Sequence, residues 1–304
     1  MKSSLFLLRR TLRLTALSLA VALQTGRAAA GDGLRGIRDM TDRAVQVPVA
    51  PSNVLSLCTS ATDAMVALKA SARLAAIEEF GRVVPGTEKL AVIGKGSAIS
   101  CEEVIKRQID LAFVWWYQDD ADRLLRQLGV PVVRLRSGKA SDVPAMLRLV
   151  GDCLNSRDEA DRLAASVEVF LKAPPPGPAV RPSVYLELYG PFKTSGEGTY
   201  VNDLITLAGG TNVASGTSGS VVLSQERLIQ SNPDVVLYIR DVTTASDLGH
   251  RGGLGGLDAV KGGRVYPVDR YWLVAGPHLP QSVAKLRGLL RASEKKGQAE
   301  NGVP

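Results

Sequence analysis

The sequence predicts an α/β fold of two Rossmann-like lobes with parallel sheets, and three observations support this prediction. Short apolar runs alternate with helical patterns along most of the 304 residues, as in parallel sheets that helices cover on both faces. The alternation occurs twice, before and after one amphipathic segment. A proline-rich stretch, PPPGP at 174–178, ends that segment. We therefore expect one long backbone helix to join the lobes and a ligand cleft to lie between them.

The N-terminal lobe is expected at 45–140. Apolar runs predict its strands at 53–58, 89–94, 111–116 and 131–136. Amphipathic patterns predict its helices at 60–80, 100–108 and 119–129. Because the strands are almost wholly apolar, both faces of this sheet should be buried.

Residues 141–178 should connect the lobes through helices and the proline-rich turn. In the segment 156–173, Ser156 and Glu159 form a candidate capping box. Its apolar face at helical spacing consists of Ala160, Leu163, Ala164, Val167, Phe170 and Leu171. A single rigid crossing should keep the lobes nearly fixed when a ligand binds.

The C-terminal lobe is expected at 179–292, before a polar tail at 293–304. Its predicted strands are 183–188, 233–239 and 263–268, and its predicted helices are 200–210, 224–232 and 279–293. Gly209 and Gly210 should end the first of these helices, since glycine readily adopts the left-handed conformation of a helix C-terminus.

Residues 1–30 read as a cleaved signal peptide, which predicts a periplasmic protein. Four basic residues between 2 and 13 precede the apolar stretch 14–23, which is too short to span a bilayer. Three alanines at 28–30 then offer a cleavage site. Removing the signal's five basic residues lowers the formal net charge from +7 to +2. The basic composition therefore gives no reason to expect a nucleic-acid partner.

Few residues suit catalysis or metal binding. The chain has only two histidines, His250 and His278, and no GxSxG motif. We therefore expect no catalytic residue, no protein-held metal and no resident cofactor. The three cysteines, Cys58, Cys101 and Cys153, are an odd number in a long chain, so we interpret them as small buried hydrophobic residues.

Aromatic residues follow the predicted strands at the edge where parallel sheets bind ligands. The candidates are Trp115, Trp116, Tyr117, Tyr189, Phe192 and Trp272. Since neighbours on a strand face opposite ways, we expect Trp115 to contact a flat ligand and Trp116 to pack into the lobe.

Basic residues accompany these aromatics at the same strand ends. They are Lys95, Arg136, Lys139, Lys193 and Arg270. Flat rings beside cations suit a large, flat, anionic ligand, because stacking provides contact area and the cations bind carboxylates or phenolates.

Several motifs, in order, resemble the single-helix class of periplasmic binding proteins. These proteins serve ABC importers for cobalamin, ferric siderophores and haem. The motifs are VLSLCTSATDAMVALKA at 54–70, SCEEVIKRQIDLAFVW at 100–115, AGGTNVA at 208–214, LSQERLIQSNPDVVL at 223–237 and GPHLPQSVAKL at 276–286. The resemblance covers roughly 53–290. This sequence has Asp63 where the family pattern has glutamate, and His278 where arginine is common.

The resemblance implies a monomer that captures a small molecule and delivers it to a permease dimer. By motif, Glu102 and Glu226 would be the carboxylates, one on each lobe, that dock to the permease. Lys95 stands where haem-binding members usually carry tyrosine. With the other lysines it favours a ferric siderophore or a carboxylated cofactor such as pyrroloquinoline quinone over a corrinoid or haem. A secreted hydrolase and a stand-alone scavenger or sensor remain alternatives.

Overall fold

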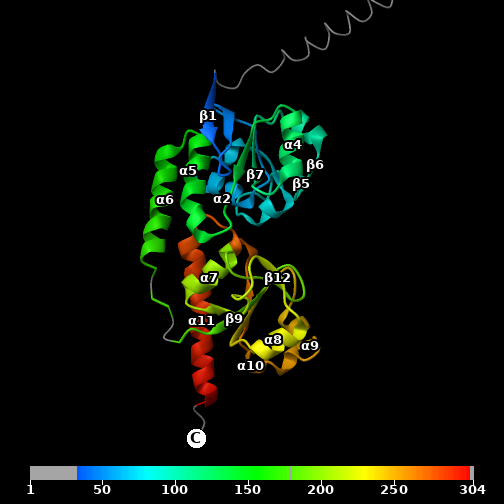
Figure 1. The fold of residues 1–304 in the computed structure, drawn as a ribbon, viewed down its shortest axis with the longest axis vertical. Coiled ribbons are helices and arrows are strands. Elements are labelled where there is room, and N and C mark those ends of the chain that lie inside the picture. The colour runs from blue at the N-terminus through cyan, green and yellow to red at the C-terminus, as the bar shows by residue number, and fades with distance from the viewer. Residues whose placement is uncertain (1–32, 175, 178–179, 302–304) are drawn as a thin grey trace, which may run out of the picture.

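The computed structural model describes residues 33–174, 176–177 and 180–301, and the expected signal peptide lies outside them. Two α/β lobes are stacked along the long axis of the molecule (Figure 1). Three long helices, α5 (Val143–Cys153), α6 (Arg157–Lys172) and α11 (Leu279–Asn301), lie along one side. No helix in the described part of the chain is both long and apolar enough to cross a bilayer.

The N-terminal lobe contains a six-stranded sheet in the order β6-β5-β4-β3-β7-β8. Its strands are β3 (Val54–Ser56), β4 (Leu74–Glu78), β5 (Ala91–Lys95), β6 (Ala98–Ile99), β7 (Leu111–Trp115) and β8 (Val132–Leu135). All neighbours pair in parallel except the short β6, which is antiparallel to β5. Helices α2 (Thr59–Ala67), α3 (Cys101–Lys106) and α4 (Asp119–Gln127) belong to the same lobe. The carboxyl ends of the parallel strands therefore share one edge.

The prediction of a helix over 60–80 is wrong in its second half. Helix α2 ends at Ala67, and Lys69 then adopts a left-handed backbone with φ of 58°. The following apolar run, 74–77, forms β4 between β3 and β5. A short run of alanines and aliphatic residues fits a helix or a buried strand equally well, so sheet pairing decides its conformation.

The C-terminal lobe contains a four-stranded parallel sheet in the order β11-β9-β13-β14. Its strands are β9 (Ser183–Glu187), β11 (Thr211–Asn212), β13 (Val235–Ile239) and β14 (Val265–Val268), and its helices include α7 (Tyr200–Ala208), α8 (Gln225–Ser231), α9 (Ala245–His250) and α10 (Asp258–Lys261). A ribbon of β10 (Lys193–Ser195) and β12 (Ser220–Val222) lies beside it. Gly209 ends α7 in the left-handed conformation, with φ of 94°, as predicted. Helix α11 continues through the expected polar tail as far as Asn301.

Helix α6 carries the chain from the first lobe to the second, as the sequence predicts. It packs on α5 so closely that a Cβ at Gly151 would lie 2.2 Å from the Cβ of Ala160. The predicted capping box at its start is wrong, because the Ser156 side chain caps no backbone amide. The hydroxyl of Ser156 instead donates to the carbonyl of Leu154 at 3.4 Å. Close packing against α5, and not a side-chain cap, therefore holds α6 in place.

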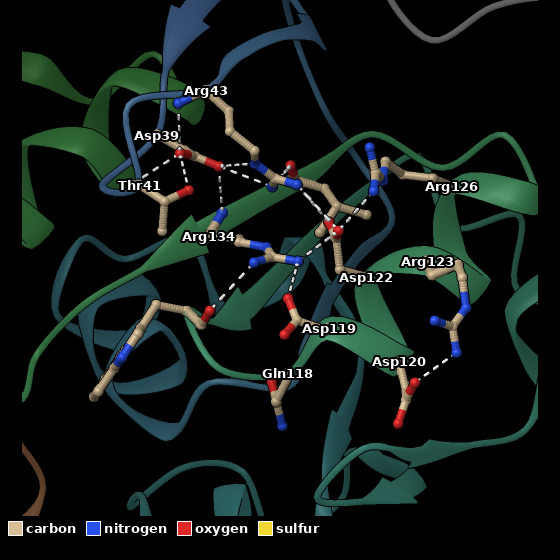
Figure 2. A network of polar contacts seen from close by, with 12 residues as sticks. Asp39, Thr41, Arg43, Gln118, Asp119, Asp120, Asp122, Arg123, Arg126 and Arg134 are labelled. Carbon is tan, nitrogen blue, oxygen red and sulfur yellow. Dashed lines mark hydrogen bonds and ion pairs between the residues drawn. The ribbon is translucent and has the colours of Figure 1, made fainter.

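A hairpin of β1 (Leu34–Arg38) and β2 (Ala44–Pro48) precedes the expected start of the N-terminal lobe. Figure 2 shows how charged residues attach it to the lobe. Asp122 on α4 has a side chain only 1% exposed and pairs with Arg43 of the hairpin at 3.0 Å. The same carboxylate pairs with Arg126 at 3.0 Å and with Arg134 of β8 at 2.8 Å. Three guanidinium groups around one buried carboxylate thus join three separate chain segments.

Asp63 connects the two lobes. This buried residue of α2 accepts a hydrogen bond from Tyr271 Oη at 2.7 Å, and its other oxygen lies 2.8 Å from His278 Nδ1. Nε2 of the same histidine lies 3.0 Å from the carbonyl of Tyr271, so the ring donates to both acceptors only when it is protonated. A Cβ at Gly276 would lie 1.9 Å from Asp63 Oδ2, so this close approach requires glycine.

We expect Asp63→Ala to loosen the lobes and to lower the free energy of unfolding by about 2–3 kcal/mol, because two half-buried donors lose their buried acceptor. Denaturant unfolding measures the loss, and solution scattering should show a larger radius of gyration. Asp110→Ala is the matched control, since Asp110 accepts bonds from Ser52 and Asn53 within one lobe. An unchanged radius of gyration in the Asp63 variant would contradict this role.

Candidate ligand-binding cleft

A cavity of about 520 Å³ lies between the lobes and is lined by residues of both. Its N-terminal wall is built from the carboxyl ends of β4, β7 and β8 and from the start of α2. Its C-terminal wall follows β9 and β13 and includes residues before α11. The volume is in the range typical of small-molecule sites.

Three consecutive aromatic residues form one wall of this cavity. Trp115 and Trp116 meet edge to face with ring centroids 5.9 Å apart, and Tyr117 meets Trp116 edge to face at 4.9 Å. Trp115 and Tyr117 are nearly parallel, at 11°. This group presents ring surface with little rotational freedom, which suits contact with a flat ligand.

Hydrogen bonds between side chains and the backbone hold the aromatic wall in place. The carbonyl oxygen of the Gln118 side chain accepts from the Trp115 amide at 2.8 Å, and its amide group donates to the Gly96 carbonyl at 3.0 Å. Arg134, part of the network in Figure 2, donates to the Trp116 carbonyl at 3.3 Å. The ion-pair network therefore orients the loop that carries the rings.

The structure does not support the expected division of roles between the two tryptophans. Both rings are half-buried and both line the cavity, but Trp115 is the one that packs against the main hydrophobic core. Trp116 instead packs near Gly138 and under the guanidinium of Arg136, at 5.8 Å from the ring centroid. Because β7 ends at Trp115, strand alternation no longer governs the direction of Trp116.

From the C-terminal lobe, Tyr189 and Arg270 line the cavity. The guanidinium of Arg270 lies 5.7 Å from the centre of the Tyr189 ring. It also pairs with Asp241 at 3.0 Å, so its charge is already neutralised within the lobe.

Six predicted ligand-binding residues are not among those that line the cavity: Lys95, Arg136, Lys139, Phe192, Lys193 and Trp272. Lys95 pairs with the exposed Glu79 at 2.8 Å, and the ring of Trp272 lies 5.0 Å from the ammonium group of Lys285. Lys139 and Lys193 are exposed. None of the predicted lysines faces the cavity, so the expected anionic character of the ligand loses its main support.

Sequence reasoning missed Glu78, a buried carboxyl at the carboxyl end of β4 that lines the cavity. Burial raises its pKa, although a hydrogen bond from Thr59 Oγ1, at 2.9 Å, acts in the opposite direction. The signal was present as two glutamates directly after an apolar run, but that run was assigned to a helix. Because β4 was not predicted as a strand, no sequence pattern placed Glu78 at the carboxyl end of a strand.

Hydroxyl groups form another part of the cavity that the sequence did not predict. Ser137 Oγ lies 2.9 Å from Ser60 Oγ, and both residues are buried in the lining. Among the residues that the structure describes, no group of three or more potential ligand side chains could hold a metal ion. Cys58 and Cys153 are buried, and none of the three cysteines forms a disulfide.

Trp115→Ala should lower the free energy of unfolding by about 2 kcal/mol, less than the ~3–5 kcal/mol of a fully buried ring. Trp116→Ala should cost less than about 1 kcal/mol, because its ring is outside the main core. Urea unfolding of both variants checks the order. A larger loss for Trp116→Ala would restore the division of roles expected from the sequence.

The pH dependence of stability should report the burial of Glu78. Because the pKa of Glu78 is higher in the folded state than its usual value of 4.5, protonation of this carboxyl favours folding at pH values below 4.5. This contribution is lost as the pH rises from that usual value through the raised pKa, at about 1.4 kcal/mol for each pH unit between the two. Glu78→Gln should therefore gain stability relative to wild type as the pH rises above about 4.5, measured by denaturant unfolding. Glu79→Gln, at the exposed neighbour, is the matched control, and parallel profiles for wild type and Glu78→Gln would contradict the assignment.

Comparison with known proteins places the chain among transport proteins. A family model described as periplasmic binding protein matches residues 54–271. An uncharacterized ABC transporter substrate-binding lipoprotein, YvrC, from Bacillus subtilis (strain 168) is 24% identical over 82% of this chain and 83% of its own length. A cobalamin-binding protein from Halobacterium salinarum is 27% identical over 66% of this chain and 57% of its own length. The fold is also that of the periplasmic haem-binding protein RhuT from Roseiflexus sp. RS-1, with a TM-score of 0.73, 23% identity and coverage of 80% and 99% of the two chains.

Proposed function

The chain belongs to the periplasmic binding protein family, and from this premise we propose that it captures a bulky, flat ligand and delivers it to an ABC importer permease. The aromatic wall of the cavity between the lobes is the observation that carries the proposal. Relatives bind cobalamin and haem, which are large, flat macrocycles. We further propose that residues 1–30 direct export to the periplasm and that the protein acts there as a monomer.

The lining of the cavity supports a flat ligand more strongly than it supports an anionic one. Four aromatic residues of the N-terminal lobe, including Phe80, and two of the other lobe, Tyr189 and Tyr200, line the cavity, so a planar molecule between them gains contact on both sides. The predicted lysines do not line it, so a ferric siderophore or a carboxylated cofactor has no particular advantage over a corrinoid. The mass of a ligand retained by protein purified from its own periplasm would identify the class.

The positions of Glu102 and Glu226 support the proposed docking role. Each is exposed in the first turn of a helix, α3 or α8, that begins at a serine cap. The caps are Ser100, which accepts from the amide of Glu103, and Ser224, which accepts from the amide of Arg227. Strand β6, directly before α3, and helix α8 both lie on the side of the molecule away from α5, α6 and α11 (Figure 1). The two carboxylates therefore suit one partner that contacts both lobes.

Each glutamate is followed three residues later by an exposed isoleucine. Ile105 on α3 is 64% exposed and Ile229 on α8 is 39% exposed. Residues three apart on a helix are neighbours, so each lobe offers a carboxylate beside an apolar side chain. A permease surface with two cationic pockets bordered by apolar residues would be complementary to this repeated arrangement.

The double variant Glu102→Gln plus Glu226→Gln should keep ligand affinity within about twofold but reduce uptake roughly tenfold, because rim charges mainly steer association. Uptake of the ligand recovered from the protein, measured with the permease in vesicles at moderate salt, tests this. Glu103→Gln is the control on the same helix, since its carboxylate is held by Lys106 and Arg107. Uptake by the double variant equal to that of wild type would refute the docking role.

A further inference from the structure

Glu78 is a buried carboxyl that lines the cavity without a neutralising cation. Its residue is 2% exposed, and its Oε1 accepts a hydrogen bond from Thr59 Oγ1 at 2.9 Å. Across the described residues, no lysine, arginine or histidine lies within 4.0 Å of it. The nearest charged neighbour along the chain, Glu79, carries the same sign and is itself paired with Lys95. The fold therefore gives this carboxyl hydrogen-bond donors, which include the backbone amides of Phe80 and Gly96, but no cation.

The hydrogen bond from Thr59 does not require a charge at this position. A glutamine would have nearly the same volume and could accept it, although the backbone amides of Phe80 and Gly96 also act on the Glu78 carboxyl and lower its pKa. Burying a carboxyl without a cation costs stability, so an amide would be the less costly choice for packing alone. A buried carboxyl that lines a cavity without a cation is a candidate for contact with a ligand.

The rest of the cavity offers little to hold an anion near Glu78. Arg270, whose charge Asp241 balances, is the one lysine or arginine among the lining residues that the structure describes. Glu78 comes from the N-terminal lobe and Arg270 from the C-terminal lobe. A ligand carboxylate placed against the N-terminal wall would thus meet a like charge and no cation.

We propose that Glu78 selects ligands that present an amide or amine N–H donor to the N-terminal wall, and that it rejects ligands that present a carboxylate there. The proposal rests on the capture function proposed above and specifies the ligand of that same cavity. A donor adds a hydrogen bond to the buried carboxylate, while the aromatic wall contacts the flat face of the ligand. The selected ligand is therefore a flat molecule with a neutral or cationic polar rim.

Two corrinoid probes with the same macrocycle test this selection. Dicyanocobinamide carries amide side chains, whereas dicyanocobyrinic acid carries carboxylates in their place. Quenching of Trp115 and Trp116 fluorescence gives both dissociation constants. Wild type should bind the amide probe at least ~tenfold more tightly, since a site built for a donor discriminates against a group that cannot donate. Glu78→Gln should reduce this ratio to about threefold or less, mainly through tighter binding of the carboxylate probe.

Control variants separate the role of Glu78 from general effects. Glu79→Gln removes a neighbouring charge outside the cavity lining and should keep the wild-type ratio. Glu78→Asp retains the charge but withdraws it by one methylene group, so the preference should keep its sign and weaken. This variant also keeps the test decisive if Glu78→Gln does not fold, which thermal unfolding of each variant shows.

Four results would overturn the proposal: an unchanged ratio in Glu78→Gln, an unchanged ratio in Glu78→Asp, a wild-type preference for the carboxylate probe, or no binding of either probe. None of these results would refute the proposed capture function, which is tested separately by uptake with the permease. Conversely, loss of uptake with the amide preference intact would leave the selection by Glu78 standing and refute the transport role.

Discussion

The contact between Asp63 and the C-terminal lobe is the interaction on which the binding cavity depends. Each wall of the cavity belongs to a different lobe, so the cavity exists only while the lobes keep their spacing. The buried carboxyl of Asp63 joins α2 to the other lobe by accepting hydrogen bonds from Tyr271 and His278, and Gly276 permits the close approach. Asp63 and His278 stand where the family pattern has glutamate and arginine, and in this protein the two side chains meet.

The cavity also shows how a rigid scaffold positions rings at a strand end. Trp115 ends β7, Gln118 fastens the following turn to Gly96, and Arg134 holds the carbonyl of Trp116. Arg134 is itself held by an ion pair with Asp122, which also pairs with guanidinium groups from two other segments (Figure 2). Charged residues distant from the ligand therefore determine the orientation of the aromatic wall. In this protein the electrostatic network serves the site through geometry and not through direct contact.

Much of the fold could be predicted from local patterns, whereas the chemistry of the site could only partly be predicted. The run ending at Trp115, the helix ended by Gly209 and the single crossing helix α6 are strong signals because period, length and turn residues agree. The run at 74–77 is alanine-rich and short, so its strand character comes from neighbours that lie far away in the sequence. Glu78 was missed for the same reason. The lysines were misplaced because position at a strand end does not determine whether a long side chain points into the cleft or into solvent.

The close packing of α5 on α6 has a consequence for the lifetime of the bound state. Because a Cβ at Gly151 would overlap Ala160, α5 and α6 are packed as one rigid unit, which limits how far α6 can move relative to the N-terminal lobe. Under the capture function proposed above, a rigid connection of this kind would let the cleft open only slightly, so a bulky ligand would exchange slowly. Fast unloading would then require the permease to move the two lobes apart.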